Sequence, residues 1–322
     1  MLAILAGGPS TALGREPPFS FPADEGRHSG AATELWTVHA FVEGKDGKSY
    51  SLAGVLFDGR WFVLSGQLAS VALTDDGAGR LVIGTNLFPP LFADVEHTEG
   101  RLHERFGRSF YRRVLGRGVE LSLRTHEVSI GLRVPVENRI SPLCGTGVAR
   151  WGSRTVFGYG IVGAHAAGAI ELDRRTIPVR GLARLDHFWS DGMEDDHDYF
   201  TASLDDGREL TVLNVHGEEG QGGLPGSCAT LADNGTTIPL EGLRLQRRRS
   251  WTSPRSGVRY PVAIAIDSAS PRLSITLTAT ADDQEASVLG VDAYHGRCAA
   301  TGQVDGKAVS GACFLMLAGY PD

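Results

Sequence analysis

Apolar and polar residues alternate with a period of two along several stretches, and this feature most limits the fold of the chain. Leu273, Ile275 and Leu277 alternate with serine and threonine within residues 272–281, and residues 119–134 show the same pattern. Successive side chains of a β-strand point to opposite faces, so each stretch predicts a strand with one face buried and the other in water. Such strands are typical of antiparallel sheets and barrels.

Asp-Gly and Asn-Gly pairs predict how these strands are joined. Glycine adopts positive φ without a steric clash, and aspartate and asparagine tolerate it, so these pairs favour the tight turns of β-hairpins. Several of them separate strand-like runs, which are therefore expected to be antiparallel neighbours. Such pairs occur at residues 46–47, 58–59, 76–77, 206–207, 234–235 and 305–306.

Helical periodicity is scarce. Residues 102–115 carry one helical stripe, in which Leu102, Phe106, Phe110 and Val114 are spaced by four with arginines between them. This spacing predicts one surface helix packed on the β structure. A basic helix that binds a membrane surface is the less favoured alternative, because the segment is isolated and the chain is acidic.

Chain length predicts two domains. At 322 residues, the chain exceeds the size at which a single hydrophobic core usually stops growing. A strand containing tryptophan and histidine precedes a hairpin in each half, at 34–39 and at 186–189, which suggests a duplicated unit. We expect an all-β chain of two antiparallel barrel or sandwich domains with little helix. The expected parts are an irregular arm over 1–30, an N-terminal domain over 31–183 and a C-terminal domain over 184–322.

Composition excludes several classes of function. A net charge of −7 argues against a nucleic-acid partner. The sequence holds no phosphate-binding glycine motif in a strand–helix context and no clustered cysteine and histidine ligands, so we expect neither a cofactor nor a metal. The short apolar start resembles neither a signal peptide nor a membrane span, and a cytoplasmic location is expected.

The four cysteines lie far apart in the sequence. Cys144, Cys228, Cys298 and Cys313 include no CxxC pair, so we expect them to be reduced and mostly buried. A single disulfide is the alternative that the spacing leaves open.

The segment Asp186–Trp189 contains the strongest group of candidate catalytic residues. On a strand, Asp186 and Phe188 point one way, whereas His187 and Trp189 point the other. An imidazole exchanges protons near neutral pH, and an indole stabilises a cation or stacks on a polyene. If these side chains face a barrel interior, they form a catalytic site. A structural histidine in a packed core is the alternative.

An earlier strand offers a second candidate group. Glu34, Trp36 and Val38 share one face of this strand, whereas Leu35, Thr37 and His39 share the other. Glu34 beside an indole is a candidate acid if desolvation raises its pKa. A carboxylate at the rim of a barrel is the alternative.

Further polar and aromatic residues follow in the C-terminal half. The acidic run Glu194, Asp195, Asp196 and Asp198 is interpreted as a solvated loop, with a divalent-cation site as the less favoured alternative. Within it, Asp198 at the entrance of a strand is a candidate catalytic acid. Candidate substrate-contacting residues, together with Trp36 and Trp189, are Tyr199, Asn214, His216 and Trp251.

Five motifs in order resemble the AttH-like family, which contains hydroxyneurosporene synthase, an acyclic carotenoid hydratase. The matching segments are 34–48, 159–189, 200–213, 251–261 and 294–320, so the resemblance spans nearly the whole chain. The sequence departs from the family pattern at Leu35, Thr37 and Arg184, where the family usually has aromatic residues. Less aromatic lining would alter the shape of a pocket.

The resemblance implies two lipocalin-like barrels with a hydrophobic pocket in or between them. Known family functions include hydration of carotenoid double bonds and cofactor-free Diels–Alder cyclisation of polyketides. The expected function is a cofactor-free cyclase acting on a hydrophobic intermediate. Trp36 and Trp189 would shape the substrate, and His187, Glu34 or Asp198 would form a hydrogen bond with its carbonyl or hydroxyl group.

Two alternative functions remain open at this point. One is a hydratase, in which Asp186 or Asp198 protonates an isoprenoid double bond and His187 positions water. The other is a non-catalytic carrier of apolar ligands. In each case the expected partner is a hydrophobic small molecule, and the chain is expected to be a monomer or a homodimer.

Overall fold

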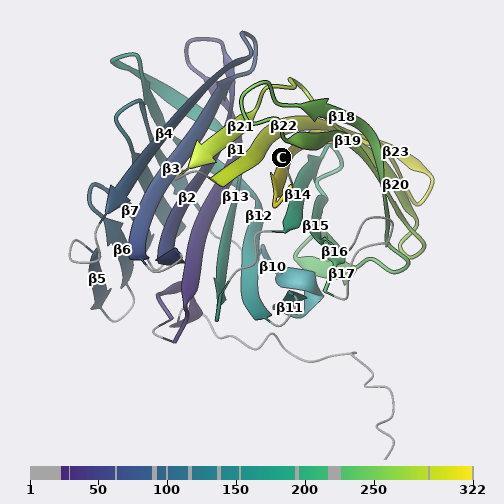
Figure 1. Cartoon of the computed structure of the whole chain (residues 1–322), viewed down its shortest axis with the longest axis horizontal. Coiled ribbons are helices and arrows are strands. Elements are labelled where there is room, and N and C mark those ends of the chain that lie inside the picture. Colours follow the sequence, from purple (N-terminus) through teal and green to yellow (C-terminus); the bar gives the residue numbers. More distant parts are fainter. Residues whose placement is uncertain are drawn as a thin grey trace, which may run out of the picture.

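The computed structural model confirms the all-β expectation, because the chain forms a nearly closed barrel and a half-barrel (Figure 1). Among the described residues, only two short 3-10 turns, Ala23–Glu25 and Leu143–Gly145, are helical. None of the helices in this described part could cross a membrane. The structure describes residues 23–28, 30–61, 64–88, 93–98, 101–114, 118–135, 139–151, 154–192, 196–216, 226–288 and 291–320.

The first sheet forms the barrel. Its strands follow the order β4-β3-β2-β1-β13-β12-β9-β8-β7-β6-β5, and the short β10 and β11 also pair with β12. All of these pairings are antiparallel, as the hairpin signals predict. The bounds are β1 (Thr33–Gly44), β2 (Ser49–Trp61), β3 (Leu64–Asp75), β4 (Arg80–Phe88), β5 (Ala93–Thr98), β6 (Arg101–Phe106), β7 (Ser109–Val114), β8 (Gly118–Arg124), β9 (Val128–Val134), β10 (Ile140–Pro142), β11 (Val148–Trp151), β12 (Arg154–Leu172) and β13 (Arg175–Ser190).

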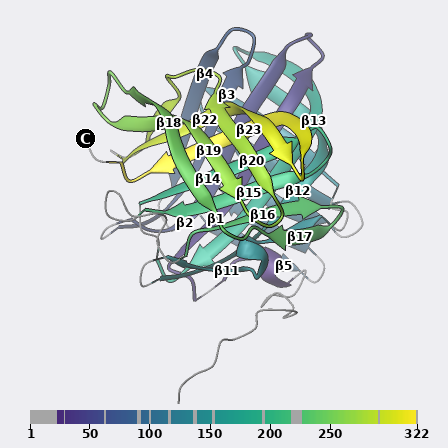
Figure 2. The same ribbon diagram turned by 90° about the vertical axis from the view of Figure 1, so that its right-hand side faces the viewer.

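The second sheet forms the half-barrel, which lies over one side of the barrel (Figure 2). Its strands follow the order β17-β16-β15-β14-β23-β22-β20-β19-β18, and β21 also pairs with β22. The bounds are β14 (His197–Leu204), β15 (Glu209–Val215), β16 (Cys228–Asp233), β17 (Thr236–Pro239), β18 (Arg244–Thr252), β19 (Arg259–Ser268), β20 (Leu273–Ala279), β21 (Glu285–Val288), β22 (Val291–Val304) and β23 (Lys307–Ala318).

The change from the first sheet to the second falls between Ser190 and His197. The boundary expected between residues 183 and 184 therefore lies inside β13, which pairs with β1 and β12 along its length. The arm expected over 1–30 lies largely outside the described residues.

The helix expected over 102–115 is wrong, because this segment forms the hairpin of β6 and β7. A spacing of four is even, so it fits one face of a strand as well as one face of a helix. Gly107 adopts a φ of +61° in the turn, a conformation that glycine reaches without strain. The aromatic residues Phe110 and Tyr111 also favour a strand over a helix.

The expectation of reduced cysteines is also wrong, because the chain forms two disulfides. Cys298 and Cys313 lie directly opposite each other on β22 and β23, with Cα atoms 4.7 Å apart. Cys144 and Cys228 join the turn after β10 to β16, and therefore link the two sheets. Strand register and sheet packing bring each pair within bonding distance. The spacing along the sequence does not report either arrangement.

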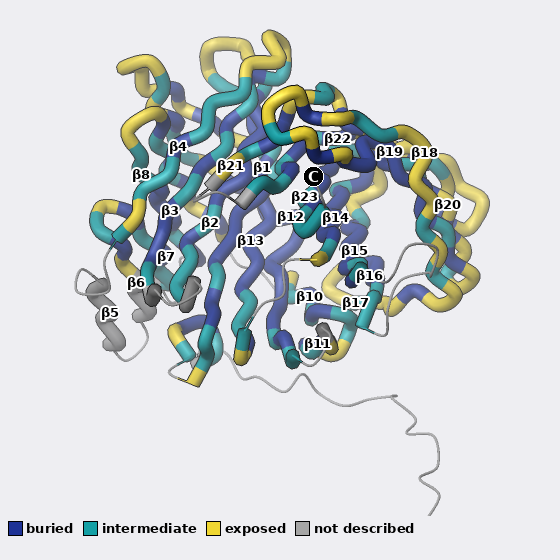
Figure 3. The backbone as a smooth tube through the Cα atoms, in the orientation of Figure 1, coloured by how far each residue is buried: buried dark blue, intermediate teal, exposed yellow. Residues whose placement is uncertain are grey.

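Buried residues occur along the strands of both sheets (dark blue in Figure 3), and the buried apolar residues form separate clusters. One core fills the barrel and includes the alternate β1 residues Trp36 and Val38. Another lies against the concave face of the half-barrel and includes Phe200 and Tyr260. A smaller cluster, with Tyr199 and its neighbours, lies between the sheets. At the contact between the sheets, β1 and β14 therefore bury most residues on both of their faces.

Candidate functional site

The two faces of β1 and β13 separate the predicted catalytic residues. Trp36 lies opposite His187 on the neighbouring strand, whereas Thr37 lies opposite Asp186. The first pair belongs to the barrel interior, because Trp36 is part of the barrel core and stacks on His187. Thr37 lines a cavity on the outer side of the sheet. The predicted residues therefore do not form one site.

Inside the barrel, Glu34 and His187 form a buried hydrogen-bonded pair. Nε2 of His187 lies 2.8 Å from Oε1 of Glu34, and the ring of His187 stacks on Trp36 at 4.8 Å. His28, which precedes β1, places Nδ1 2.7 Å from the same Glu34 oxygen and stacks on Trp189 at 3.9 Å. Four of the predicted residues thus meet, joined by His28, which sequence reasoning missed.

The electrostatics of this interior group differ from those expected of a catalytic acid. Burial alone would raise the pKa of Glu34, but hydrogen bonds from His187 and His28 hold it below its ordinary value. Burial lowers the pKa of His187, although Glu34 opposes the effect. Glu34 is therefore a carboxylate and His187 is neutral at pH 7, so Glu34 is not the protonated acid that desolvation alone would produce.

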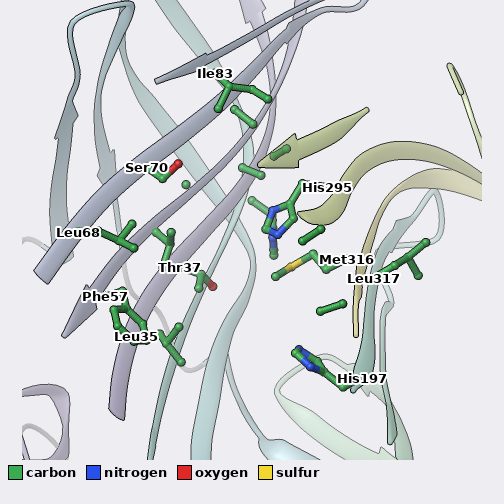
Figure 4. Close-up of a pocket in the computed structure, with 18 residues that line it drawn as sticks. Leu35, Thr37, Phe57, Leu68, Ser70, Ile83, His197, His295, Met316 and Leu317 are labelled. Carbon is green, nitrogen blue, oxygen red and sulfur yellow. The ribbon is translucent and has the colours of Figure 1, made fainter. Parts of the chain in front are cut away.

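A cavity of about 240 Å³ lies between the outer face of the barrel and the half-barrel (Figure 4). A smaller cavity of about 70 Å³ adjoins it through Leu35, Thr37, His197 and Met316, and has the predicted residue Tyr199 in its wall. Most of the larger lining is apolar. Its residues are Leu35, Thr37, His39, Ala53, Gly54, Val55, Phe57, Leu68, Ser70, Ala72, Ile83, His197, Ala286, Ala293, His295, Met316, Leu317 and Ala318.

Three histidines are among the few polar residues that line this cavity: His39, His197 and His295. Burial lowers the pKa of His39 to about 4; Arg184 and His295 add to this effect, whereas Asp186 opposes it. Burial likewise lowers the pKa of His295 to about 4. Both imidazoles are therefore neutral at pH 7. The alternation along β1 predicts that His39 and Thr37 share one face of the strand. It does not predict that this face is buried, because the half-barrel that covers it is formed by a distant part of the sequence.

Asp186 lies directly behind the polar part of the cavity wall. Its carboxylate accepts a hydrogen bond from Oγ1 of Thr37 at 3.5 Å, and its Oδ2 lies 3.9 Å from Nδ1 of His39. Nε of Arg184 donates to both carboxylate oxygens, at 2.7 and 3.0 Å, and Tyr199 donates to Oδ1 at 3.2 Å. The predicted catalytic residue Asp186 is therefore a buried, ion-paired carboxylate that supports His39.

Arg184 extends this network into the second sheet. Its two terminal nitrogens donate to Oγ1 of Thr211 at 2.7 Å and to the hydroxyl of Tyr199 at 2.8 Å. Burial raises the pKa of the neighbouring Glu209 to about 7, against the lowering effect of Arg184. At Arg184, where the family pattern has an aromatic residue, this chain therefore has a buried cation that links its two sheets.

Asp198, Asn214 and His216 form a third group, in the half-barrel. Nδ2 of Asn214 and the hydroxyl of Tyr320 each donate to Asp198 at 2.8 Å, and Nε2 of His216 lies 2.9 Å from Oδ1 of Asp198. Trp251 packs against the same core, near Tyr260. None of these four predicted residues lines the larger cavity.

The comparisons with known proteins agree with this architecture. The model of the AttH-like family matches residues 12–320. The AttH protein NE1406 from Nitrosomonas europaea has a similar structure, with a TM-score of 0.81, 23% identity, and 96% of this chain and 98% of that one covered. Kievitone hydratase from Nectria haematococca has a TM-score of 0.78 at 12% identity, with 93% and 92% covered. No curated protein matches the chain significantly.

The fold and the cavity between its sheets define an all-β protein built from a barrel and a half-barrel. Because the family model covers most of the chain, the protein belongs to the AttH-like family. Kievitone hydratase, which has a similar fold, is by its name a hydratase.

Proposed function

We propose that this protein is a hydratase that adds water to a carbon–carbon double bond of an apolar small molecule in the cavity between the sheets. The observation that carries the proposal is the pairing of His39 with Asp186 at the wall of a mostly apolar cavity. The shared fold of kievitone hydratase supports hydration over the cyclisation expected from the sequence. A cavity of this kind, apolar with few convergent polar groups, is typical of small-molecule sites.

His39 has the properties of a base that activates water. Its neutral imidazole accepts a proton at pH 7, and Asp186 beside Nδ1 would favour the tautomer that leaves the other ring nitrogen free to do so. The carboxylate would also stabilise the imidazolium as it forms. The distance of 3.9 Å exceeds a hydrogen bond, and such contacts often tighten when substrate binds.

The residues that line the cavity also limit which type of substrate double bond could be hydrated. An isolated alkene must be protonated by a strong acid, but the described residues that line the cavity include no aspartate or glutamate. A double bond conjugated to a carbonyl group instead accepts hydroxide at its β-carbon. We therefore propose an apolar α,β-unsaturated carbonyl compound as the substrate class, in place of an isoprenoid alkene.

The proposed reaction needs no external oxidant or reductant. His39 takes a proton from water, the hydroxyl oxygen bonds to the β-carbon, and the electron pair of the double bond moves towards the carbonyl oxygen. The neutral His295 would donate a hydrogen bond to this developing enolate. The imidazolium of His39 then returns the proton to the α-carbon, which completes the addition of one water molecule.

Isotope labelling tests the proposal. The protein is incubated in ¹⁸O-labelled water with apolar enones, benzylideneacetone among them, and with any apolar compound extracted from the purified protein. We expect a product heavier than its substrate by one water molecule, with the ¹⁸O atom bonded to the β-carbon. This product should form faster than in the same mixture without protein. An isomeric product without new oxygen would instead identify a cyclase, and ligand bound unchanged would identify a carrier. Either of these results would contradict the proposal.

A further inference from the structure

We propose that His28, Glu34 and His187 bind a divalent transition metal of the zinc class at one end of the barrel interior. Nδ1 of His28 and Nε2 of His187 lie 2.7 and 2.8 Å from Oε1 of Glu34. All three donor atoms are within 4.8 Å of one another. This group lies on the interior face of the sheet, apart from the cavity between the sheets, so the inference does not depend on the proposed hydratase activity.

The chemistry of the three donors favours a particular class of ion. Two imidazoles and one carboxylate are the ligand set of many catalytic zinc sites and of non-haem iron sites, whereas magnesium and calcium prefer oxygen donors alone. Zinc bonds of roughly 2.0–2.2 Å in tetrahedral geometry separate neighbouring ligand atoms by about 3.3 Å. The present contacts of 2.7 and 2.8 Å would therefore open by about half an ångström as the ion replaces the bridging protons.

The surroundings of the donors match those of metal ligands. A ligating histidine usually offers its other ring nitrogen to a carboxylate or a main-chain carbonyl. Nε2 of His28 lies 3.2 Å from Oδ1 of Asp24. The main-chain N–H of His28 donates to Oε2 of Glu34 at 3.0 Å, which orients the carboxylate. His28 and Glu34 thus each have a supporting contact outside the proposed coordination sphere, whereas the buried Nδ1 of His187 has no hydrogen-bond partner among the described residues.

Aromatic rings hold the histidines in place. His187 stacks on Trp36 at 4.8 Å and His28 on Trp189 at 3.9 Å. The side chains of Glu34 and His187 are only 3% and 2% exposed, whereas that of His28 is 20% exposed. A metal ion would therefore enter from the side of His28, and solvent would supply the remaining ligand.

Metal binding at this position would fasten the segment Ala23–His28 to the barrel. This segment already contacts the barrel through an ion pair between Glu25 and Arg113, and through a hydrogen bond from Nε1 of Trp36 to the carbonyl of Glu25. His28 is its only contribution to the proposed donor set. Because the ion would bind only when the segment is seated, it would stabilise the folded chain by mass action.

The full chain, without a histidine tag and stripped with EDTA, provides the test. Zinc is titrated by calorimetry, cobalt(II) by its visible absorption, and the zinc content after gel filtration is measured by mass spectrometry. We expect one equivalent of zinc, a rise in the midpoint of thermal unfolding with zinc, and cobalt bands typical of four or five nitrogen and oxygen ligands. No binding by the native chain would overturn the proposal.

Variants assign the binding to these residues. His28→Ala removes a half-buried ligand outside the strands, so the barrel is expected to fold, and zinc affinity should fall at least tenfold. Glu34→Gln should have a similar effect. His126→Ala, an exposed histidine in the turn between β8 and β9, is the matched control and should leave affinity unchanged. Unchanged affinity in His28→Ala, or a loss confined to His126→Ala, would show adventitious binding and overturn the proposal.

Discussion

Asp186 places Oδ2 3.9 Å from Nδ1 of His39, on the face of the barrel that the half-barrel covers. Both residues are more than nine-tenths buried, and Nε of Arg184 donates to the carboxylate of Asp186. This arrangement needs both sheets, because Tyr199 and Thr211 of the second sheet complete the contacts of Arg184. The proposed chemistry and the attachment of the two sheets therefore depend on the same buried charges.

Asp186→Asn should destabilise the protein strongly. The substitution leaves the buried guanidinium of Arg184 without its carboxylate partner, and breaking a buried ion pair costs about 3 kcal/mol or more in the free energy of unfolding. Urea unfolding followed by tryptophan fluorescence measures the change. Asp173→Asn, in the exposed ion pair with Arg80, is the matched control and should change stability little. Equal effects of the two substitutions would contradict the structural role of Asp186.

Glu209 should contribute a pH dependence of stability. Its pKa of about 7 in the folded protein exceeds its ordinary value of 4.5, so the folded chain holds a proton that the unfolded chain releases between these pH values. Stability from this group is complete below pH 4.5 and is lost as the pH rises through 7. The side chain of Glu209→Gln stays neutral, so the variant does not lose this stability. Its free energy of unfolding relative to that of the native chain should therefore rise by about 3 kcal/mol between pH 4.5 and 7.

Urea unfolding of both proteins at several pH values measures this difference. His39 and His295, with pKa values near 4, make stability rise with pH between about 4 and 6.5. Both proteins contain these histidines, so their contribution cancels in the difference between the two free energies of unfolding. A difference between Glu209→Gln and the native chain that stays constant over this pH range would contradict the predicted pKa of Glu209.

Removing the disulfide between the sheets should cost more than removing the disulfide within one sheet. Cys144 and Cys228 are separated by 84 residues, whereas Cys298 and Cys313 are separated by 15. In the chain-entropy description, the longer loop makes the larger contribution, about 4.5 against 3 kcal/mol. The double alanine variants of each pair are compared by urea unfolding. Alkylation of the native chain without reduction should label no cysteine; labelling of all four would contradict both bonds.

The sequence predicts the fold better than it predicts the site. Period-two alternation and the Asp-Gly turns predict strands and hairpins because both signals are local. The same alternation correctly predicts that the side chains of Asp186 and His187 point to opposite faces of the sheet. The helix predicted over 102–115 is wrong because a spacing of four residues fits both the helical period and the period of two of a strand. Within this segment, Gly107 alone marks the turn between the two strands.

The site depends on contacts that no local pattern reports. His39 and His295 are far apart in the sequence, and only the packing of one sheet on the other brings them to the same cavity. His28 lies before the first strand, in a segment expected to be irregular, and its contact with Glu34 depends on how that segment folds back. The disulfides likewise depend on register between distant strands.

The central claim is that water is added in the cavity between the sheets, at His39, and that the barrel interior at His187 has no part in the reaction. The most direct test compares the rate of ¹⁸O incorporation by His39→Gln and His187→Gln, each first shown to be folded by near-ultraviolet circular dichroism. We predict that His39→Gln loses about 100-fold or more in turnover, as expected for the loss of a general base. His187→Gln should retain most of the activity per folded molecule. Loss of activity in His187→Gln with full activity in His39→Gln would contradict this account.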